Sequence, residues 1–479
     1  PPRPGESEPP MRYLPADEQQ RLLAACYERS RLTPEQLWMR YFGLGGGQSL
    51  LELDAYLNGL TTLPRVDRDM LAHAVNERLD ELAGPSRAPY SHSFRDGKPL
   101  HGPLKALVDL LEGAHRAPPE RLPAVVAEAG RALDLRIGIY LADYDQRTLV
   151  PLRAEAAAEL DIETSVAGDV FRRAETVVTR DGPAPTLWTV LLDGVERLGV
   201  LEIVPTDDAD LDDPMLREQC HWLATLLGHL VTITTQYGDG LDVRRRRQHR
   251  ATPAELLWQS LPPLTGATDC VIVGASVQPA YDLRGVVFDY ALSERRARLA
   301  MFDAGTRTDG AGYAVVNALA AYRAARRDGA SLGEQYTAVG RELAGSEPVV
   351  TGVLAELDLR TGTLRWLTAG HHPAPLIVRD GRALAESEAG PAGATAGERP
   401  RAVEVRLRPG DVLALYSHGL TGTTDRAGTP FSRERVAGYL AEERLPPEAA
   451  RLLTRAVADH GAGEPRSDAG VLVARWVPR

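Results

Sequence analysis

The feature that most constrains the fold is a short apolar run near the end of the sequence, VLALY at residues 412–416. It follows RPGD at 408–411, a combination of Pro, Gly and Asp that is typical of a tight turn. A continuous apolar run of this length after a turn predicts a strand that is buried on both faces. Ser417, His418 and Gly419 come next, where a strand end presents a side chain to a pocket. His418 is therefore the first candidate for a functional residue.

Length and composition indicate a multidomain globular protein. A chain of 479 residues is long for one hydrophobic core and predicts two to four domains. The net charge of −11 argues against a general nucleic-acid binder. Cys26, Cys220 and Cys270 are odd in number and far apart, which favours reduced thiols over a disulfide framework or a zinc site. No apolar run is long enough to span a bilayer and no basic-then-apolar leader is present, so we expect a cytoplasmic protein.

The pattern of apolar residues divides the sequence into regions of different kinds. The first ten residues, PPRPGESEPP, predict a disordered tail, and residues 11–117 carry leucines at helical spacing that predict a helical module. Residues 118–236 alternate helix and hairpin patterns and end in a long helix, which predicts an α+β layout. Residues 237–263 predict a helical linker. Its basic run at 244–247 is compatible with a solvated helix face or with a linker that pairs across a dimer.

The order of elements in residues 118–236 resembles a GAF domain. The resemblance rests on YLADYDQRTLVPL (140–152), AGDVFRRAETVV (167–178) and LLDGVERLGVLEIV (191–204). It implies an α/β sensor that binds a small molecule or mediates dimerisation. Cys220 lies in the closing helix, where we expect it in the core rather than attached to a chromophore. We therefore expect a GAF-like sensor domain and a homodimer.

Residues 264–479 resemble the SpoIIE-like branch of the metal-dependent serine/threonine phosphatases of the PPM family. The resemblance rests on PAYDLRGVVFDYAL (279–292), the strand–turn–strand phrase LTAGHHPAPLIV (367–378), SHG (417–419) and SDAGVLVARW (467–476). It implies an αββα sandwich in which carboxylates at strand ends hold two Mg²⁺ or Mn²⁺ ions that activate a water for attack on a phosphoserine. The expected fold class is therefore multidomain α+β, with a helical N-terminal module, a GAF-like α/β sensor and a PPM-type αββα sandwich.

Three positions at which the family pattern has an acid carry other residues here. The resemblance places the metal-bridging Asp at Val286, the Asp of a Tyr-(Thr/Ser)-Asp-Gly strand at His418, and the first acid of an Asp-Asp pair at Ser467. An apolar side chain such as that of Val286 cannot coordinate a metal ion. Asp303 and Asp468 keep their acids, and we expect them to hold any metal that binds.

Two arginines, Arg284 and Arg307, lie in the motifs that form the same predicted pocket. The second motif is normally Asp-X-X-Gly-His-Gly, and here Arg307 replaces its His. In the first motif, Arg284 lies two residues before Val286. The first motif also keeps its second acid, Asp289. Two cations near few carboxylates oppose a dication by Coulomb repulsion and favour a phosphate or a carboxylate. We therefore treat Arg284 and Arg307 as anion-binding candidates and expect no metal cofactor.

These substitutions predict a bacterial signalling regulator in which a GAF-like domain is coupled to a SpoIIE-like pseudophosphatase that acts by protein binding. The family resemblance implies an anti-sigma-factor kinase, its antagonist or a related phosphatase as the partner. Two alternatives stay open. One is an active Mn²⁺- or Mg²⁺-dependent phosphoserine/threonine phosphatase that acts on an anti-sigma-factor antagonist, with a site rebuilt from Asp303, His418 and Asp468. The other is a protein whose GAF-like domain is the main actor, with residues 264–479 as a dimerisation platform.

Overall fold

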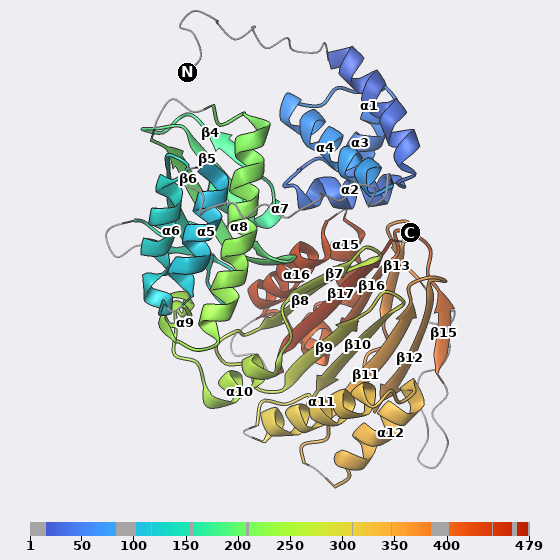
Figure 1. Ribbon diagram of the computed structural model, residues 1–479. Helices are drawn as coiled ribbons and strands as arrows, with labels where there is room; N and C mark the ends of the chain where they lie inside the picture. Colours follow the sequence, from blue (N-terminus) through green and yellow to red (C-terminus); the bar gives the residue numbers. More distant parts are fainter. Residues whose placement is uncertain are drawn as a thin grey trace, which may run out of the picture. The chain divides into compact units, whose positions relative to one another are not determined.

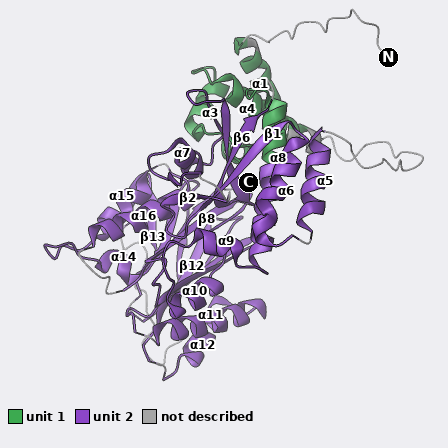
Figure 2. Ribbon diagram, turned by 90° about the vertical axis from the view of Figure 1, so that its left-hand side faces the viewer, with its two compact units in different colours: residues 1–98, 210–221 green, residues 99–209, 222–479 purple. Residues whose placement is uncertain are grey.

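The computed structural model of the chain divides into two compact units, which Figure 2 colours separately. Unit 1 comprises residues 1–98 and 210–221, and unit 2 comprises residues 99–209 and 222–479. The described residues are 16–82, 102–115, 117–152, 157–206, 210–308, 310–345, 347–370, 372–384, 402–442, 444–461 and 467–477. The predicted tail at 1–10 lies outside them.

Unit 1 is helical between residues 16 and 82, as the sequence predicts. The helices there are α1 (Ala16–Ser30), α2 (Pro34–Gly43), α3 (Leu50–Leu57) and α4 (Arg65–Leu82). Capping boxes begin α2 and α3. The side chains of Thr33 and Ser49 accept hydrogen bonds from the backbone N of Gln36 and Glu52, respectively, and the side-chain oxygens of Gln36 and Glu52 accept from the backbone N of Thr33 and Ser49. Tyr41 is fully buried in the apolar core that these helices share.

The first part of unit 2 is an antiparallel sheet with helices beside it (Figure 1). Its six strands follow the order β3-β2-β1-β6-β5-β4. In chain order the elements are α5 (Gly102–Ala114), η1 (Pro119–Arg121), α6 (Leu122–Arg131), β1 (Leu135–Ala142), β2 (Thr148–Pro151), β3 (Leu160–Asp161), α7 (Val166–Arg173), β4 (Val177–Thr179), β5 (Thr186–Asp193), β6 (Glu196–Pro205) and α8 (Pro214–Thr235). The first turns of α8 belong to unit 1, and Cys220 is buried there, as expected.

Two short helices, α9 (Gly240–Arg245) and α10 (Thr252–Ser260), connect this sheet to the C-terminal part of unit 2. Arginines in and just after the basic run at 244–247 contact β1 and the turn that follows it. Arg245 donates from Nε to the carbonyl of Ala142 at 2.8 Å, and the buried Arg250 places its guanidinium 4.1 Å from the ring centroid of Tyr144. A guanidinium over an aromatic ring is held by cation–π attraction. These contacts anchor the connector to the first sheet.

The rest of unit 2 contains two antiparallel sheets packed face to face between helices (Figure 1). One sheet has the order β15-β12-β11-β10-β9 with α11 and α12 against it, and the other has the order β14-β13-β16-β17-β8-β7 with α15 and α16 against it. The strands are β7 (Thr265–Thr268), β8 (Val271–Gln278), β9 (Val286–Leu292), β10 (Arg296–Asp303), β11 (Thr351–Asp358), β12 (Thr363–Ala369), β13 (Leu376–Arg379), β14 (Arg382–Ala383), β15 (Val403–Arg406), β16 (Val412–Tyr416) and β17 (Ala469–Trp476). The helices are α11 (Ala311–Arg327), α12 (Leu332–Glu342), α14 (His418–Gly422), α15 (Arg433–Ala441) and α16 (Pro446–His460).

Residues of both sheets form one apolar core, and all five residues of β16 are buried, as predicted. The prediction of a mixed α and β chain with a helical N-terminal region is confirmed. In the part of the chain that the structure describes, no helix combines the length and apolar character needed to cross a membrane.

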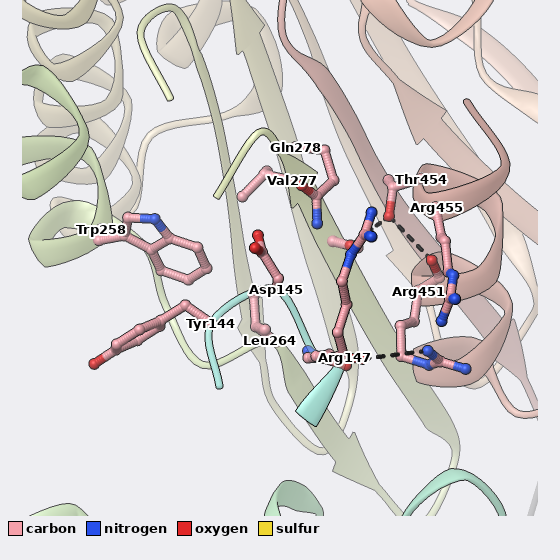
Figure 3. Close-up of a pocket in the computed structure, with 12 residues that line it drawn as sticks. Tyr144, Asp145, Arg147, Trp258, Leu264, Val277, Gln278, Arg451, Thr454 and Arg455 are labelled. Carbon is pink, nitrogen blue, oxygen red and sulfur yellow. Dashed lines mark hydrogen bonds between the residues drawn. The ribbon is translucent and has the colours of Figure 1, made fainter. Parts of the chain in front are cut away.

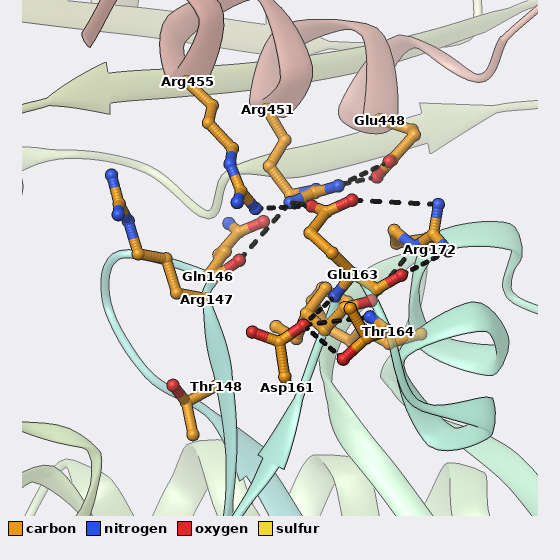
Figure 4. A network of polar contacts seen from close by, with 12 residues as sticks. Gln146, Arg147, Thr148, Asp161, Glu163, Thr164, Arg172, Glu448, Arg451 and Arg455 are labelled. Atoms are coloured by element: carbon orange, nitrogen blue, oxygen red, sulfur yellow. Dashed lines mark hydrogen bonds and ion pairs between the residues drawn. The ribbon is translucent and has the colours of Figure 1, made fainter. Parts of the chain in front are cut away.

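Buried and half-buried charged side chains join the first sheet to the C-terminal sheets within unit 2 (Figure 4). Arg451 of α16 donates to Glu448 at 2.9 and 2.7 Å and to Glu163, which follows β3, at 2.8 Å. Arg455 donates to the same oxygen of Glu163 at 2.6 Å, and Arg197 of β6 donates to Glu448 at 3.1 Å. We call these five residues the seam network. Burial opposes ionisation of Glu448, but Arg451 and Arg197 hold its pKa below the usual value.

Candidate functional site

Val286 lies between the two C-terminal sheets, at the position where the family pattern has its bridging acid. It is the first residue of β9, is fully buried, and pairs in register with Asp303 of β10. Its side chain points at the opposite sheet, because a Cβ built on Gly470 of β17 would lie only 2.5 Å from Cγ1 of Val286. A glycine at 470 permits this close approach of the sheets. Methyl groups therefore occupy the space that a bridging carboxylate would need.

Asp289, the retained second acid of the first motif, faces away from this space. Successive side chains of a strand alternate between its faces, so residues three apart point to opposite sides. Asp289 accordingly contacts Arg323 and Arg326 of α11 at 2.6 Å each. Its carboxylate ties β9 to the outer helix and is not part of the pocket.

Asp303 and His418 contact each other where β10 and β16 end. His418 is the first residue of the short helix α14 rather than the last residue of the strand. Oδ2 of Asp303 accepts a hydrogen bond from the backbone N of His418 at 2.8 Å and lies 3.1 Å from its Nδ1. Oδ1 accepts one from the backbone N of Gly305 at 2.7 Å. Both oxygens of this buried carboxylate therefore accept hydrogen bonds from the protein.

Asp468 is held by the two segments that carry the arginines. Its Oδ2 accepts hydrogen bonds from the backbone N of Arg284 at 2.7 Å and of Gly285 at 2.6 Å, and its Oδ1 accepts from the guanidinium of Arg307. The side chain of Asp468 is 0% exposed. Burial raises the pKa of this carboxyl to about 6, although Arg307 and the two N–H donors act in the opposite direction.

Arg307 and Arg284 converge on Asp282, which no sequence pattern singled out. Nη2 of Arg307 donates to the carbonyl oxygen of Asp282 at 2.7 Å and to its Oδ2 at 2.5 Å. Nε of Arg284 donates to Oδ1 of the same residue at 2.9 Å. Asp282 and Asp468 thus balance the positive charge that the sequence places at this pocket.

Two serines and one histidine, Ser417, Ser467 and His372, also lie beside His418 or Asp468. Ser417 donates from Oγ to the carbonyl of Asp468 at 2.9 Å and so joins the ends of β16 and β17. His372, from the turn after β12, is buried, and its ring centroid lies 5.7 Å from that of His418. Burial lowers the pKa of His372 to about 4. Ser417 and His372 were not predicted as site residues, although they lie in the motifs SHG (417–419) and LTAGHHPAPLIV (367–378). Ser467 precedes Asp468 and is half-buried.

These residues do not fit a two-metal centre. Within the described residues, no group of three or more His, Cys, Asp or Glu side chains is placed so that it could hold a metal ion. Mg²⁺ and Mn²⁺ take several oxygen ligands. Asp303 and Asp468 already accept protein hydrogen bonds through all four carboxylate oxygens, and Val286 contributes none. The described residues at this site therefore do not supply the set of oxygen ligands that two Mg²⁺ or Mn²⁺ ions need.

A cleft lies beside the seam network (Figure 3). This cleft, about 380 Å³ including space open to solvent, separates the turn after β1 from β8 and α16. Its charged lining residues are Asp145, Arg147, Arg451 and Arg455. Burial raises the pKa of Asp145 to about 6. Gln278, which also lines the cleft, pairs in register with Ala469, the residue after Asp468. The cleft and the site around Asp468 therefore share the strand pair β8–β17.

A family model described as Stage II sporulation protein E (SpoIIE) matches residues 307–477. No curated protein matches the chain. Matching solved structures include the RsbU and RsbW domains of a Mycobacterium tuberculosis protein, at 23% identity and a TM-score of 0.36, with 44% of this chain and 61% of that chain covered. The chain therefore spans less than two thirds of that protein's structure. The SpoIIE phosphatase domain of Bacillus subtilis matches at 19% identity and a TM-score of 0.34, with 44% of this chain and 93% of that chain covered. The SiaA PP2C domain of Pseudomonas aeruginosa matches at 19% identity and a TM-score of 0.36, with 42% of this chain and 85% of that chain covered. Residues 307–477 thus match the SpoIIE family model.

Proposed function

We propose that this protein is a bacterial signalling regulator whose SpoIIE-family domain is a pseudophosphatase and acts by binding another protein. The observation that carries the proposal is the occupation of the pocket by protein groups. Val286 fills the inter-sheet position with methyl groups, and the carboxylates of Asp303 and Asp468 are engaged by protein donors. A divalent ion would have to displace those donors and would still lack its shared ligand.

The partner in this proposal is an anti-sigma-factor kinase, its phosphorylatable antagonist or a related phosphatase. These classes follow from the family resemblance. Arg284 and Arg307 place positive charge at the pocket, with side chains 30% and 13% exposed. Arginine forks suit phosphate and carboxylate groups. An anionic group of the partner would compete with Asp282 for both arginines.

The proposal includes a domain plan. Residues 11–117 form a helical module, residues 118–236 a GAF-like sensor, residues 237–263 a linker and residues 264–479 the output domain. The antiparallel sheet with neighbouring helices in the second of these regions supports the sensor assignment. A small-molecule ligand of the sensor and a homodimer belong to the same proposal.

The test is hydrolysis of a phosphoserine peptide by the full chain with excess Mn²⁺ or Mg²⁺. We expect no rate above that of buffer, and no change with the Asp303→Ala variant. The peptide is also incubated with an active SpoIIE-type phosphatase, to show that it can be hydrolysed. A metal-dependent rate in the wild-type chain that Asp303→Ala abolishes would establish the active-phosphatase alternative instead.

A further inference from the structure

A single guanidinium holds together three segments at the pocket. Asp282 precedes β9, Arg307 follows β10, and Asp468 precedes β17, so the contacts of Arg307 join the edge of one C-terminal sheet to the other. Arg307 itself is 13% exposed and Asp468 is 0% exposed. A buried carboxylate needs a nearby positive charge or strong donors, because removing it from water is costly.

The atoms around this guanidinium are oxygens of the kind that bind divalent cations. Arg307 donates to a carboxylate oxygen of Asp468, to a carboxylate oxygen of Asp282 and to the backbone carbonyl of Asp282. Carboxylate and carbonyl oxygens are the preferred ligands of Mg²⁺ and Mn²⁺. Arg307 stands where the family pattern Asp-X-X-Gly-His-Gly has its histidine, four residues after Asp303.

We propose that Arg307 is a built-in cation that replaces a metal ion in holding this pocket together. The domain then keeps the ends of β9, β10 and β17 in place without any divalent ion. This inference goes beyond the proposed function, because it concerns what stabilises the pocket and not what the pocket binds. Its readout is therefore thermal stability rather than activity.

The substitution that tests the proposal is Arg307→Ala, measured by thermal unfolding of the full chain in EDTA and in millimolar Mn²⁺. The wild-type Tm should be the same in both. Loss of a buried ion pair should lower the Tm of the variant by about 6–15 °C in EDTA. Mn²⁺ should restore part of that loss, because the oxygens of Asp282 and Asp468 become available to it. Arg307→Lys should fall between wild type and Arg307→Ala in EDTA, since lysine brings one charge without the planar fork.

The matched control is Arg379→Ala. Arg379 forms another partly buried pair, donating from Nε and Nη2 to Asp411, whose side chain is 2% exposed. That variant should also lose stability, but Mn²⁺ should not restore it, because only one acid is uncovered. If Arg307→Ala does not fold, the same comparison is made on its refolding yield with and without Mn²⁺.

Three outcomes would overturn the inference. They are a wild-type Tm that depends on metal, an Arg307→Ala variant that loses no stability, and an Arg307→Ala variant that Mn²⁺ restores no better than Arg379→Ala. A metal-dependent Tm in a catalytically inactive wild-type chain would refute this inference alone. The proposed function is refuted by hydrolysis, which is measured separately.

Discussion

Replacing Arg451 by alanine tests whether the seam network stabilises the contact between the first sheet and the C-terminal sheets. The Arg451 side chain is 4% exposed and donates two hydrogen bonds to Glu448 and one to Glu163. Removing one partner of a buried ion pair costs about 3–5 kcal/mol. Both carboxylates keep a second arginine, Arg197 or Arg455, which compensates part of the charge. We therefore expect Arg451→Ala to lower the free energy of unfolding by about 3 kcal/mol, near the lower end of that range.

The assay combines urea unfolding with limited trypsin digestion. If the seam network loosens, the connector with its arginines at 244–247 should be cut faster, because Arg245 donates to Ala142 of the first sheet and the backbone N of Arg247 donates to the hydroxyl of Tyr281 in the C-terminal part. The matched control is Arg365→Ala, whose ion pair with Glu404 is 57% and 54% exposed. An exposed pair of this kind contributes about 0–1 kcal/mol.

The reasoning fails if Arg451→Ala is no less stable than Arg365→Ala and if trypsin cuts both at the wild-type rate. A double-mutant cycle with Glu163→Gln adds a direct measure of the contact across the seam. A coupling energy near zero would show that Arg451 acts only through Glu448, which lies on its own helix.

Two further predictions concern other buried positions. Burial raises the pKa of Glu196, which bonds to Thr265 across the seam, to about 7 from an ordinary 4.5. The folded state therefore binds this proton more tightly than the unfolded state, and the contribution of Glu196 to stability falls as pH rises from about 4.5 to about 7. Glu196→Gln should remove that fall, so its stability relative to wild type should rise between pH 5 and 8 by up to roughly 3 kcal/mol, measured by urea unfolding. Gly470→Ala should be destabilising by about 1–3 kcal/mol, because its Cβ would lie 2.5 Å from Cγ1 of Val286. Adding Val286→Ala should recover part of that loss in thermal unfolding.

Each of these two predictions has a clear contrary result. A stability difference between Glu196→Gln and wild type that is independent of pH would mean that the carboxyl does not titrate in this window. Equal stability of the Gly470→Ala protein with and without Val286→Ala would show that Val286 is not the group that the new methyl meets.

Local sequence patterns were sufficient to predict individual helices and strands and to say which side chains can coordinate a metal ion. Five consecutive apolar residues after a turn predicted β16, and the strand is buried along its whole length. The side chain of Val286 excludes metal coordination wherever it lies. The spacing of Val286 and Asp289 was also sufficient to place their side chains on opposite faces of the strand, because the two residues are three positions apart. That pattern alone separates Asp289 from the pocket.

The sequence by itself determined which acids are missing and that two arginines stand beside the retained ones. Only the tertiary structure decided what those arginines contact. Arg307 and Asp468 are 161 positions apart, and Arg197 and Glu448 are 251 positions apart. Such pairs form because separate strands and helices pack against one another, and residue spacing contains no record of that packing. The same holds for His372 and His418, which two different strand ends bring to a ring distance of 5.7 Å. Residue types therefore set which side chains are present at this site, and packing set how their charges are paired.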